Sequence, residues 1–184
     1  MLPTPTSSRF QALRSGLINL FKYEQQEFWF EKGRLLIRGN NGTGKSRVLA
    51  LQLPFLLDGR IEPRYVEPDR DPARRIDWHL LMDQYRERTG YSWIEFGRRD
   101  DAGTEHYVTL GIGLRAVHGG DSNRWFFITE KRMGADFQLV ENSHPVSKDR
   151  LAEILGTSCL YPTAREYRAE VDRRLFSLGR ERYE

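Results

Sequence analysis

The sequence contains a single cysteine, Cys159, among its 184 residues. One thiol cannot close a disulfide within the chain, so we expect a reducing, cytoplasmic environment. The longest nearly apolar run, Val48 to Leu57, is interrupted by Gln52 and Pro54 and is too short to span a bilayer. The first eight residues lack the charged and apolar regions of a signal peptide. These absences predict a soluble cytoplasmic protein with no membrane partner.

The chain also lacks a strong excess of one charge. It has 29 Lys and Arg against 26 Asp and Glu, a formal net charge of +3. That excess is too small to establish nucleic-acid binding, and a charge-balanced surface is the default expectation. A DNA-binding face is a second expectation, because phosphate contacts need only spatially grouped basic side chains. Its candidates are Arg9, Arg14, Lys22, Arg98, Arg99, Arg115, Arg124, Lys131 and Arg132.

Metal-ligand spacing is missing as well. The four histidines are isolated from one another and are expected to be structural; they are His79, His106, His118 and His144. The four tryptophans are expected to anchor the core or a partner interface rather than to stack on bases. They are Trp29, Trp78, Trp93 and Trp125.

One octapeptide carries a specific chemical signal: Gly39-Asn40-Asn41-Gly42-Thr43-Gly44-Lys45-Ser46. It fits the phosphate-binding loop pattern G-x-x-x-x-G-K-[ST]. Glycines let the backbone turn tightly, so that successive N–H groups form an anion-binding concavity. In such a loop Lys45 places its charge on the β- and γ-phosphates and is the candidate catalytic residue, while the Ser46 hydroxyl binds Mg²⁺. We include the adjacent Arg47 in the expected nucleotide-binding set.

The neighbours of a phosphate loop should be a strand before it and a helix after it. Residues Arg34 to Arg38 form a short apolar run that predicts a buried strand. Apolar residues from Val48 onward predict a helix that Pro54 kinks or ends. Residues 58–75 contain many charges and three prolines and are expected to form a long surface connection.

The remaining pattern predicts strands first and helices last. Strands are expected at Gly16–Phe21, Glu27–Phe30, Tyr91–Phe96, His106–Val117, Trp125–Glu130 and, short, Phe137–Val140, with a short helix at Ile76–Tyr85. The strands at Tyr91–Phe96, His106–Val117 and Trp125–Glu130 are separated by turns and are predicted to form an antiparallel meander. Ser147 is expected to cap a helix that ends at Gly156, and Thr163 with Glu166 forms a capping box for a second helix. The apolar face of that second helix comprises Tyr167, Val171, Leu175 and Leu178.

The octapeptide resembles the G-x-N-G-x-G-K-S form used by SMC, Rad50-like and RecF-like ATPases, with Asn41 and Gly42 as the diagnostic pair. A closer resemblance is to the N-terminal head segment of the SMC-like ATPase of Wadjet anti-plasmid systems, which is related to the MukB and MksB condensins. The segments that carry it are Arg9–Phe10, Gly16–Leu20, Gly33–Gly39, Leu53–Gly59, Thr89–Gly97 and Leu175–Gly179.

This resemblance implies an α/β P-loop NTPase fold, specifically the N-terminal lobe of an ABC/SMC-type head with a mixed sheet, an antiparallel meander and C-terminal helices. Residues 1–8 would be a frayed N-terminus, and residues 9–184 would be the N-terminal half of the head. The implied ligands are ATP and Mg²⁺. The implied partners are the C-terminal half of the same head, a second head in a homodimer, a kleisin, a winged-helix subunit, a Toprim-type nuclease and DNA.

An SMC head is completed by residues that this sequence does not contain. We find no apolar strand ending in Asp-Glu, no Ser-Gly-Gly signature and no sustained heptads. The chain is therefore expected to be a fragment of a longer ATPase that binds nucleotide weakly and hydrolyses it very slowly. Heads of this class also carry an arginine that reaches the nucleotide from the segment after the phosphate-loop helix, and Arg74 and Arg75 are the candidates.

Three other functions remain open at this point. The chain could be a self-contained P-loop kinase or NTPase, which would need an acceptor site and a second acidic Mg²⁺ ligand. It could be a RecF- or Rad50-like head that acts in DNA repair. It could also be a non-catalytic interaction module in which Gly39–Ser46 is only a structural turn.

Overall fold

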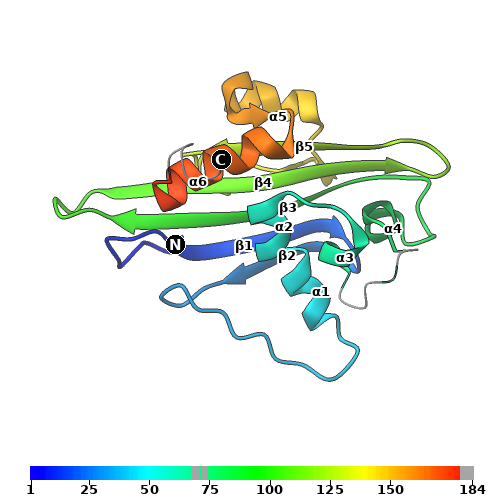
Figure 1. Ribbon diagram of the computed structural model, residues 1–184, viewed down its shortest axis with the longest axis horizontal. Coiled ribbons are helices and arrows are strands. Elements are labelled where there is room, and N and C mark those ends of the chain that lie inside the picture. The colour runs from blue at the N-terminus through cyan, green and yellow to red at the C-terminus, as the bar shows by residue number, and fades with distance from the viewer. Residues whose placement is uncertain (68–70, 72–73, 179–184) are drawn as a thin grey trace.

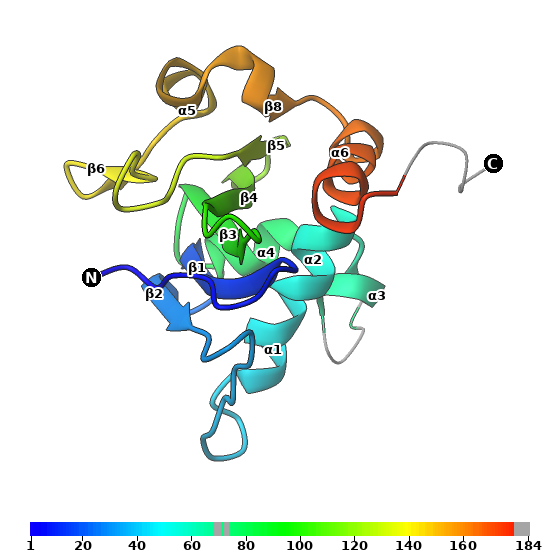
Figure 2. The same ribbon diagram turned by 90° about the vertical axis from the view of Figure 1, so that its left-hand side faces the viewer.

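The computed structural model describes residues 1–67, 71 and 74–178. They form a mixed α/β fold built on a six-stranded sheet in the order β2-β1-β3-β4-β5-β8 (Figures 1 and 2). The strands of this sheet are β1 (Gln11–Leu20), β2 (Tyr23–Trp29), β3 (Glu87–Arg99), β4 (Glu105–Val117), β5 (Ser122–Thr129) and β8 (Leu160–Tyr161). A separate hairpin consists of β6 (Val140–Glu141) and β7 (His144–Pro145).

The helices are short except for the last one. They are α1 (Lys45–Ala50), α2 (Leu53–Asp58), α3 (Pro63–Val66), α4 (Ile76–Leu81), α5 (Lys148–Leu155) and α6 (Ala164–Phe176), with a 3₁₀ turn at Thr157–Cys159. Figure 2 shows α5 on one side of the sheet and α1 to α4 with α6 on the other. No helix in the described part of the chain is long and apolar enough to cross a membrane.

The pairings between neighbouring strands of the large sheet are all antiparallel, so the expectation of a mixed sheet is wrong. A parallel neighbour requires a crossover that returns the chain to the end where the first strand began. Here the helical segment between β2 and β3 instead delivers β3 antiparallel to β1. The predicted meander is confirmed as β3, β4 and β5, which are joined by hairpins.

Each face of the sheet carries its own apolar core. One core places Leu17, Ile94 and Leu110 under the side chains of α1, α2, α4 and α6. The other gathers Trp93, Trp125 and further residues under α5 and the preceding loops. The strands therefore bury side chains on both faces, and their long apolar stretches alternate little between apolar and polar residues.

A glycine in the middle of β4 makes room for one of the aromatic rings. A Cβ added to Gly113 would meet the indole nitrogen of Trp125 on the neighbouring strand. A side chain at this position would thus overlap the ring. Glycine weakens a strand on its own but allows this close packing.

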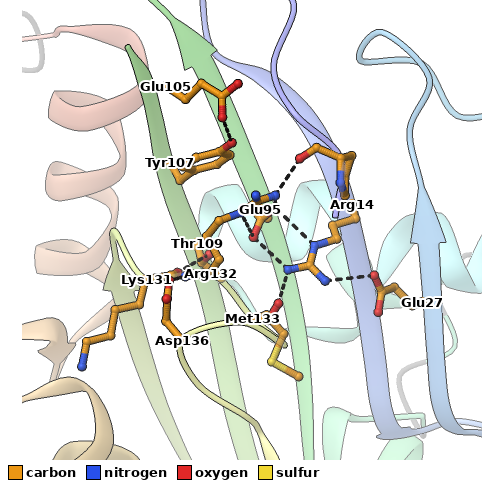
Figure 3. A network of polar contacts seen from close by, with 11 residues as sticks. Arg14, Glu27, Glu95, Glu105, Tyr107, Thr109, Lys131, Arg132, Met133 and Asp136 are labelled. Carbon is orange, nitrogen blue, oxygen red and sulfur yellow. Dashed lines mark hydrogen bonds and ion pairs between the residues drawn. The ribbon is translucent and has the colours of Figure 1, made fainter. Parts of the chain in front are cut away.

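A charged network crosses the sheet inside the fold (Figure 3). The Glu95 carboxylate on β3 is fully buried and accepts hydrogen bonds from Arg14 on β1 at 3.2 and 2.9 Å and from Arg132 at 2.7 and 3.3 Å. Arg14 also donates to Glu27 on β2 and to the carbonyl of Met133. Glu95 and Arg14 together therefore connect β1, β2 and β3 with the loop after β5.

This network corrects the expected DNA-binding face. Arg14 is only 2% exposed, and Arg132 is bonded to the same carboxylate, so both basic groups are used inside the fold. Arg115 pairs with Glu87 on the surface. Arg14 cannot share a surface with the other eight basic residues, because both faces of β1 are covered there and its guanidinium pairs with Glu95 and Glu27.

The predicted caps of the last two helices are confirmed. The Ser147 hydroxyl accepts from the Arg150 N–H at 3.2 Å, and the Thr163 hydroxyl accepts from the Glu166 N–H at 3.2 Å. Gly156 follows α5 with a φ of 95°. Tyr167 and Val171 are buried, Leu175 is half-buried, and Leu178 lies beyond the end of α6.

Three local predictions are wrong. Residues 137–140 form no strand apart from Val140, which belongs to the β6–β7 hairpin. The helix after the octapeptide ends already at Ala50, and Pro54 lies in the first turn of α2, where its missing N–H costs nothing. The stretch 58–75 is not wholly a surface connection, because α3 lies within it and Val66 and Glu67 are buried. Residues 68–70 and 72–73 lie outside the described residues.

The first eight residues, which we expect to fray, contact the sheet at several points. Pro5 is buried, and the carbonyl of Pro3 accepts from Arg132 at 2.7 Å. The carbonyl of Ser7 accepts from the Arg99 N–H at the end of β3. These contacts attach the start of the chain to the end of the sheet opposite the β1–β2 turn.

Candidate functional site

The octapeptide follows a long excursion at the β2 edge of the sheet (Figure 1). The chain leaves β2, makes a bridge between Glu31 and Arg34, and continues as irregular backbone until α1 begins at Lys45. The turn between β1 and β2 supports the loop from the side. The Tyr23 hydroxyl lies 3.5 Å from the Thr43 carbonyl, and the Phe21 ring lies beside Gly44.

The expected strand at 34–38 is not formed, and this prediction is wrong. Only Arg34 takes part in a bridge, and Leu36 is 72% exposed. An apolar run becomes a strand only when a second strand supplies partners for its backbone N–H and C=O groups. β2 is the edge strand of the sheet, yet in the described structure residues 34–38 do not pair with its open side and so have no partner strand.

The glycines of the loop are placed where other residues would be strained. Gly42 has a φ of 83° and Gly44 a φ of 87°, both in the left-handed region that glycine adopts at little cost. Gly39 is restricted by space instead, since a Cβ there would lie 2.8 Å from the Thr43 hydroxyl. That hydroxyl donates to the Asn40 carbonyl at 2.8 Å and closes the turn.

Lys45 folds back over this turn. Its ammonium group donates to the carbonyls of Gly39 and Asn40, both at 2.7 Å. Two of the three N–H donors of the ammonium group are used within the loop. These two bonds hold the positive charge of Lys45 at the loop. The arrangement fits an anion, because the positive group is already fixed beside the exposed backbone of the turn.

The other polar residues of the motif are accessible to solvent. Asn40, Asn41, Thr43 and Ser46 are exposed, and Ser46 lies in the first turn of α1 next to Lys45. A hydroxyl in this position is an oxygen donor of the kind that Mg²⁺ accepts. The described residues contain no group of three or more His, Cys, Asp or Glu side chains that could hold a metal by themselves.

Arg47 makes its side-chain contacts outside the octapeptide. Its guanidinium donates to Glu67 at 2.6 Å and lies 4.4 Å from the centre of the Phe21 ring and 5.5 Å from that of Trp78. Only 12% of this side chain is exposed. The structure therefore brings residues 39–46 together at the surface and places the Arg47 side chain in the layer beneath them.

The two candidate arginines from the next segment have different surroundings. Arg74 lies 3.7 Å from Glu67 and 3.5 Å from Asp71, and its guanidinium is 5.2 Å from the Trp78 ring centre. Arg75 is 72% exposed, and its nearest acidic neighbour is Asp77 at 3.9 Å. Arg74 thus joins the cluster around Arg47, whereas Arg75 faces solvent.

Glu67 is the centre of this cluster, which we call the Glu67 cluster: Glu67, Arg47, Arg74, His79 and the rings of Phe21 and Trp78. The carboxylate is fully buried and lies 3.3 Å from His79 Nε2. Burial lowers the pKa of His79 to about 4, although the charge of Glu67 opposes this shift. At neutral pH the imidazole is therefore uncharged, and its contact with Glu67 is not an ion pair.

Sequence reasoning missed four of these residues: Phe21, Glu67, Trp78 and His79. Glu67 precedes Pro68 in a charged stretch that is typical of a surface loop, so its local pattern gives no sign of burial. The one available signal for this cluster was the presence of aromatic and basic residues in 74–79. Their spacing in the sequence does not indicate that they contact α1. The contact between α1 and this segment becomes visible only in the fold.

A wide hollow in the described part of the chain lies elsewhere. It measures about 1170 Å³ and is lined by residues from the start of β1, the β3–β4 ends and the end of α6, including Phe10, Phe96 and Phe176. The octapeptide lies at the other end of β1, beyond Leu20. The loop and the hollow are therefore separate features, and only the loop carries a recognisable chemical motif.

Comparison with known proteins adds no further assignment to this geometry. No protein-family model matches the chain, and no curated protein sequence is significantly similar to it.

Proposed function

We propose that the chain binds ATP with Mg²⁺ through Gly39–Ser46. The observation that carries this proposal is the position of the Lys45 ammonium group, held at 2.7 Å by two carbonyls of a turn whose glycines adopt left-handed conformations. The backbone N–H groups of the turn and Lys45 would hold the phosphates, and Ser46 would bind the metal. ATP would supply a phosphoanhydride bond whose hydrolysis can drive a conformational cycle.

We further propose that the chain belongs to the P-loop NTPase class as the N-terminal half of an SMC-like head of a Wadjet-type plasmid defence system. The proposal is supported by the β-hairpin before the loop, the meander after it and the two capped helices at the end, but not by the strand expected directly before the loop, which is not formed. In this proposal the C-terminal half of the head covers the open β2 edge. Large apolar side chains in the segments flanking the loop are exposed and would be buried by it: Leu36, Leu49 and Leu53.

The same proposal names the larger assembly. A second head would complete the ATP site, and a kleisin, a winged-helix subunit, a Toprim-type nuclease and DNA would be the other partners. Lys45 would then act as a catalytic residue by stabilising charge on the transferring phosphoryl group. The groups that activate water would come from outside Met1–Glu184, since the sequence has no strand that ends in Asp-Glu.

An ATP turnover assay on the 184-residue chain tests this division of labour. We expect binding of ATP with turnover far below the usual enzymatic range of about 1 s⁻¹ and above. Addition of the C-terminal half of an SMC-like head, as a separately expressed chain, is expected to raise the rate. Turnover at a normal enzymatic rate by the chain alone, abolished by Lys45→Ala, would instead indicate a self-contained NTPase.

The two arginines provide a second test of the site. Arg74→Ala is expected to weaken ATP binding by about tenfold, because a charge-assisted contact contributes roughly 1.5 kcal/mol or more. Arg75→Ala removes an identical group from a solvent-exposed position one residue away and is expected to leave the Kd unchanged. Equal effects of the two substitutions, measured by calorimetric titration, would count against a specific role for Arg74.

A further inference from the structure

The Glu67 cluster joins three separate parts of the chain through one carboxylate. Glu67 Oε1 lies 2.6 Å from Arg47 on α1 and 3.7 Å from Arg74, and Glu67 Oε2 lies 3.3 Å from His79 on α4. The Glu67 side chain is 0% exposed, so the surrounding residues restrict its position. The side chain of one glutamate thereby determines how far the 74–79 segment lies from the helix that begins at Lys45.

The Trp78 ring reinforces this arrangement. The guanidinium groups of Arg47 and Arg74 lie 5.5 and 5.2 Å from its centre, within the range of cation–π attraction. Both cations therefore share one carboxylate and one indole, and Arg74 also lies 3.5 Å from Asp71. The Phe21 ring contacts Arg47 on one side and lies beside Gly44 of the loop on the other, which links the cluster to the turn itself.

A purely stabilising role explains this cluster poorly. Buried ion pairs contribute little net stability, because the cost of removing charges from water offsets their attraction. A fixed carboxylate does hold an arginine side chain in one conformation, since this side chain has many rotamers and loses them when its guanidinium is anchored. Only Ser46 separates Lys45 from Arg47 in α1, so a shift of Arg47 acts close to the loop along the chain.

We infer that Glu67 is a positioning residue that holds Arg74 beside α1 and thereby sets the affinity of the site for ATP. The inference rests on the proposed function, in which Arg74 contacts the nucleotide. Glu67 itself does not contact the ligand, and its effect passes through Arg74. It follows that Glu67 should matter for ATP binding only while Arg74 is present.

A double-mutant cycle tests this dependence. The Kd for Mg-ATP is measured by calorimetry for the wild-type chain, Glu67→Gln, Arg74→Ala and the double variant. Glu67→Gln alone is expected to weaken binding on the order of fivefold, and to change nothing in the Arg74→Ala background. Equal weakening in both backgrounds would overturn the inference, as would an unchanged Kd in Glu67→Gln.

Two further variants separate positioning from folding. His79→Gln alters the same cluster without removing a charge. It is expected to lower the melting temperature while leaving the Kd for Mg-ATP unchanged. If the Kd instead follows the melting temperature in every variant, Glu67 does not act by positioning Arg74. If Glu67→Gln does not fold, Glu67→Asp replaces it in the cycle, because it keeps the charge and moves the carboxylate back by one methylene. It is also expected to weaken ATP binding only when Arg74 is present. If the wild-type chain does not bind ATP, the proposed function is wrong. If it binds ATP but the effects of Glu67→Gln and Arg74→Ala are additive, only this inference is wrong.

Discussion

Replacing Lys45 by alanine is expected to weaken Mg-ATP binding by roughly 10- to 100-fold. The substitution removes the ammonium group that lies 2.7 Å from two carbonyls of the loop, and with it the charge-assisted contacts to phosphate. Such contacts contribute about 1.5 to 3 kcal/mol each, which corresponds to this range of Kd. Calorimetric titration of the variant and the wild type under the same conditions measures the change.

Lys148→Ala is the matched control for this substitution. Lys148 is an exposed lysine at the start of α5, which lies on the opposite side of the sheet from α1, so its removal makes the same change in net charge without touching the loop. Its Kd for Mg-ATP is expected to equal that of the wild type. If the two variants bind ATP equally well, Gly39–Ser46 is a structural turn rather than a phosphate site.

Replacing Glu95 by alanine is expected to lower the free energy of unfolding by about 3 to 5 kcal/mol. The Glu95 carboxylate is fully buried between Arg14 and Arg132, so its loss leaves Arg14 buried without its main counter-charge (Figure 3). A loss of this size is a large part of the 5 to 15 kcal/mol that stabilises a typical domain. Equilibrium unfolding in urea measures it.

Glu87→Ala provides the comparison from the same strand. Glu87 also pairs with an arginine, Arg115, but both side chains are about half exposed and the pair is screened by water. Its removal is expected to cost at most about 1 kcal/mol. Similar losses for Glu87→Ala and Glu95→Ala would show that the buried network does not tie the sheet together as described.

Local chemistry accounts for the parts of the fold that the sequence predicts well. The meander follows from apolar strands separated by short turns, and both helix caps follow from a hydroxyl placed before a helical pattern. The tight turn at Gly42 and Gly44 follows from residue type, since both adopt the positive φ that glycine permits, whereas phosphate binding by this turn stays a prediction. These features need no knowledge of distant contacts.

The incorrect predictions share a different physical origin. Arg34–Arg38 has the composition of a strand, but strand formation depends on a neighbour that composition does not reveal. Arg14 looks like a surface base in the sequence and is buried because Glu95, 81 residues away, lies opposite it. Glu67 looks like a loop residue and is buried for the same kind of reason. Each outcome is decided by long-range pairing rather than by local pattern.

Calorimetric titration of the wild-type chain with ATP in the presence of Mg²⁺ tests the central claim most directly. We expect saturable binding with one site per chain, which weakens when Mg²⁺ is chelated because Ser46 then loses the metal that it shares with the phosphates. Absence of heat and of any saturable signal up to millimolar ATP would contradict the claim that Gly39–Ser46 is a nucleotide site.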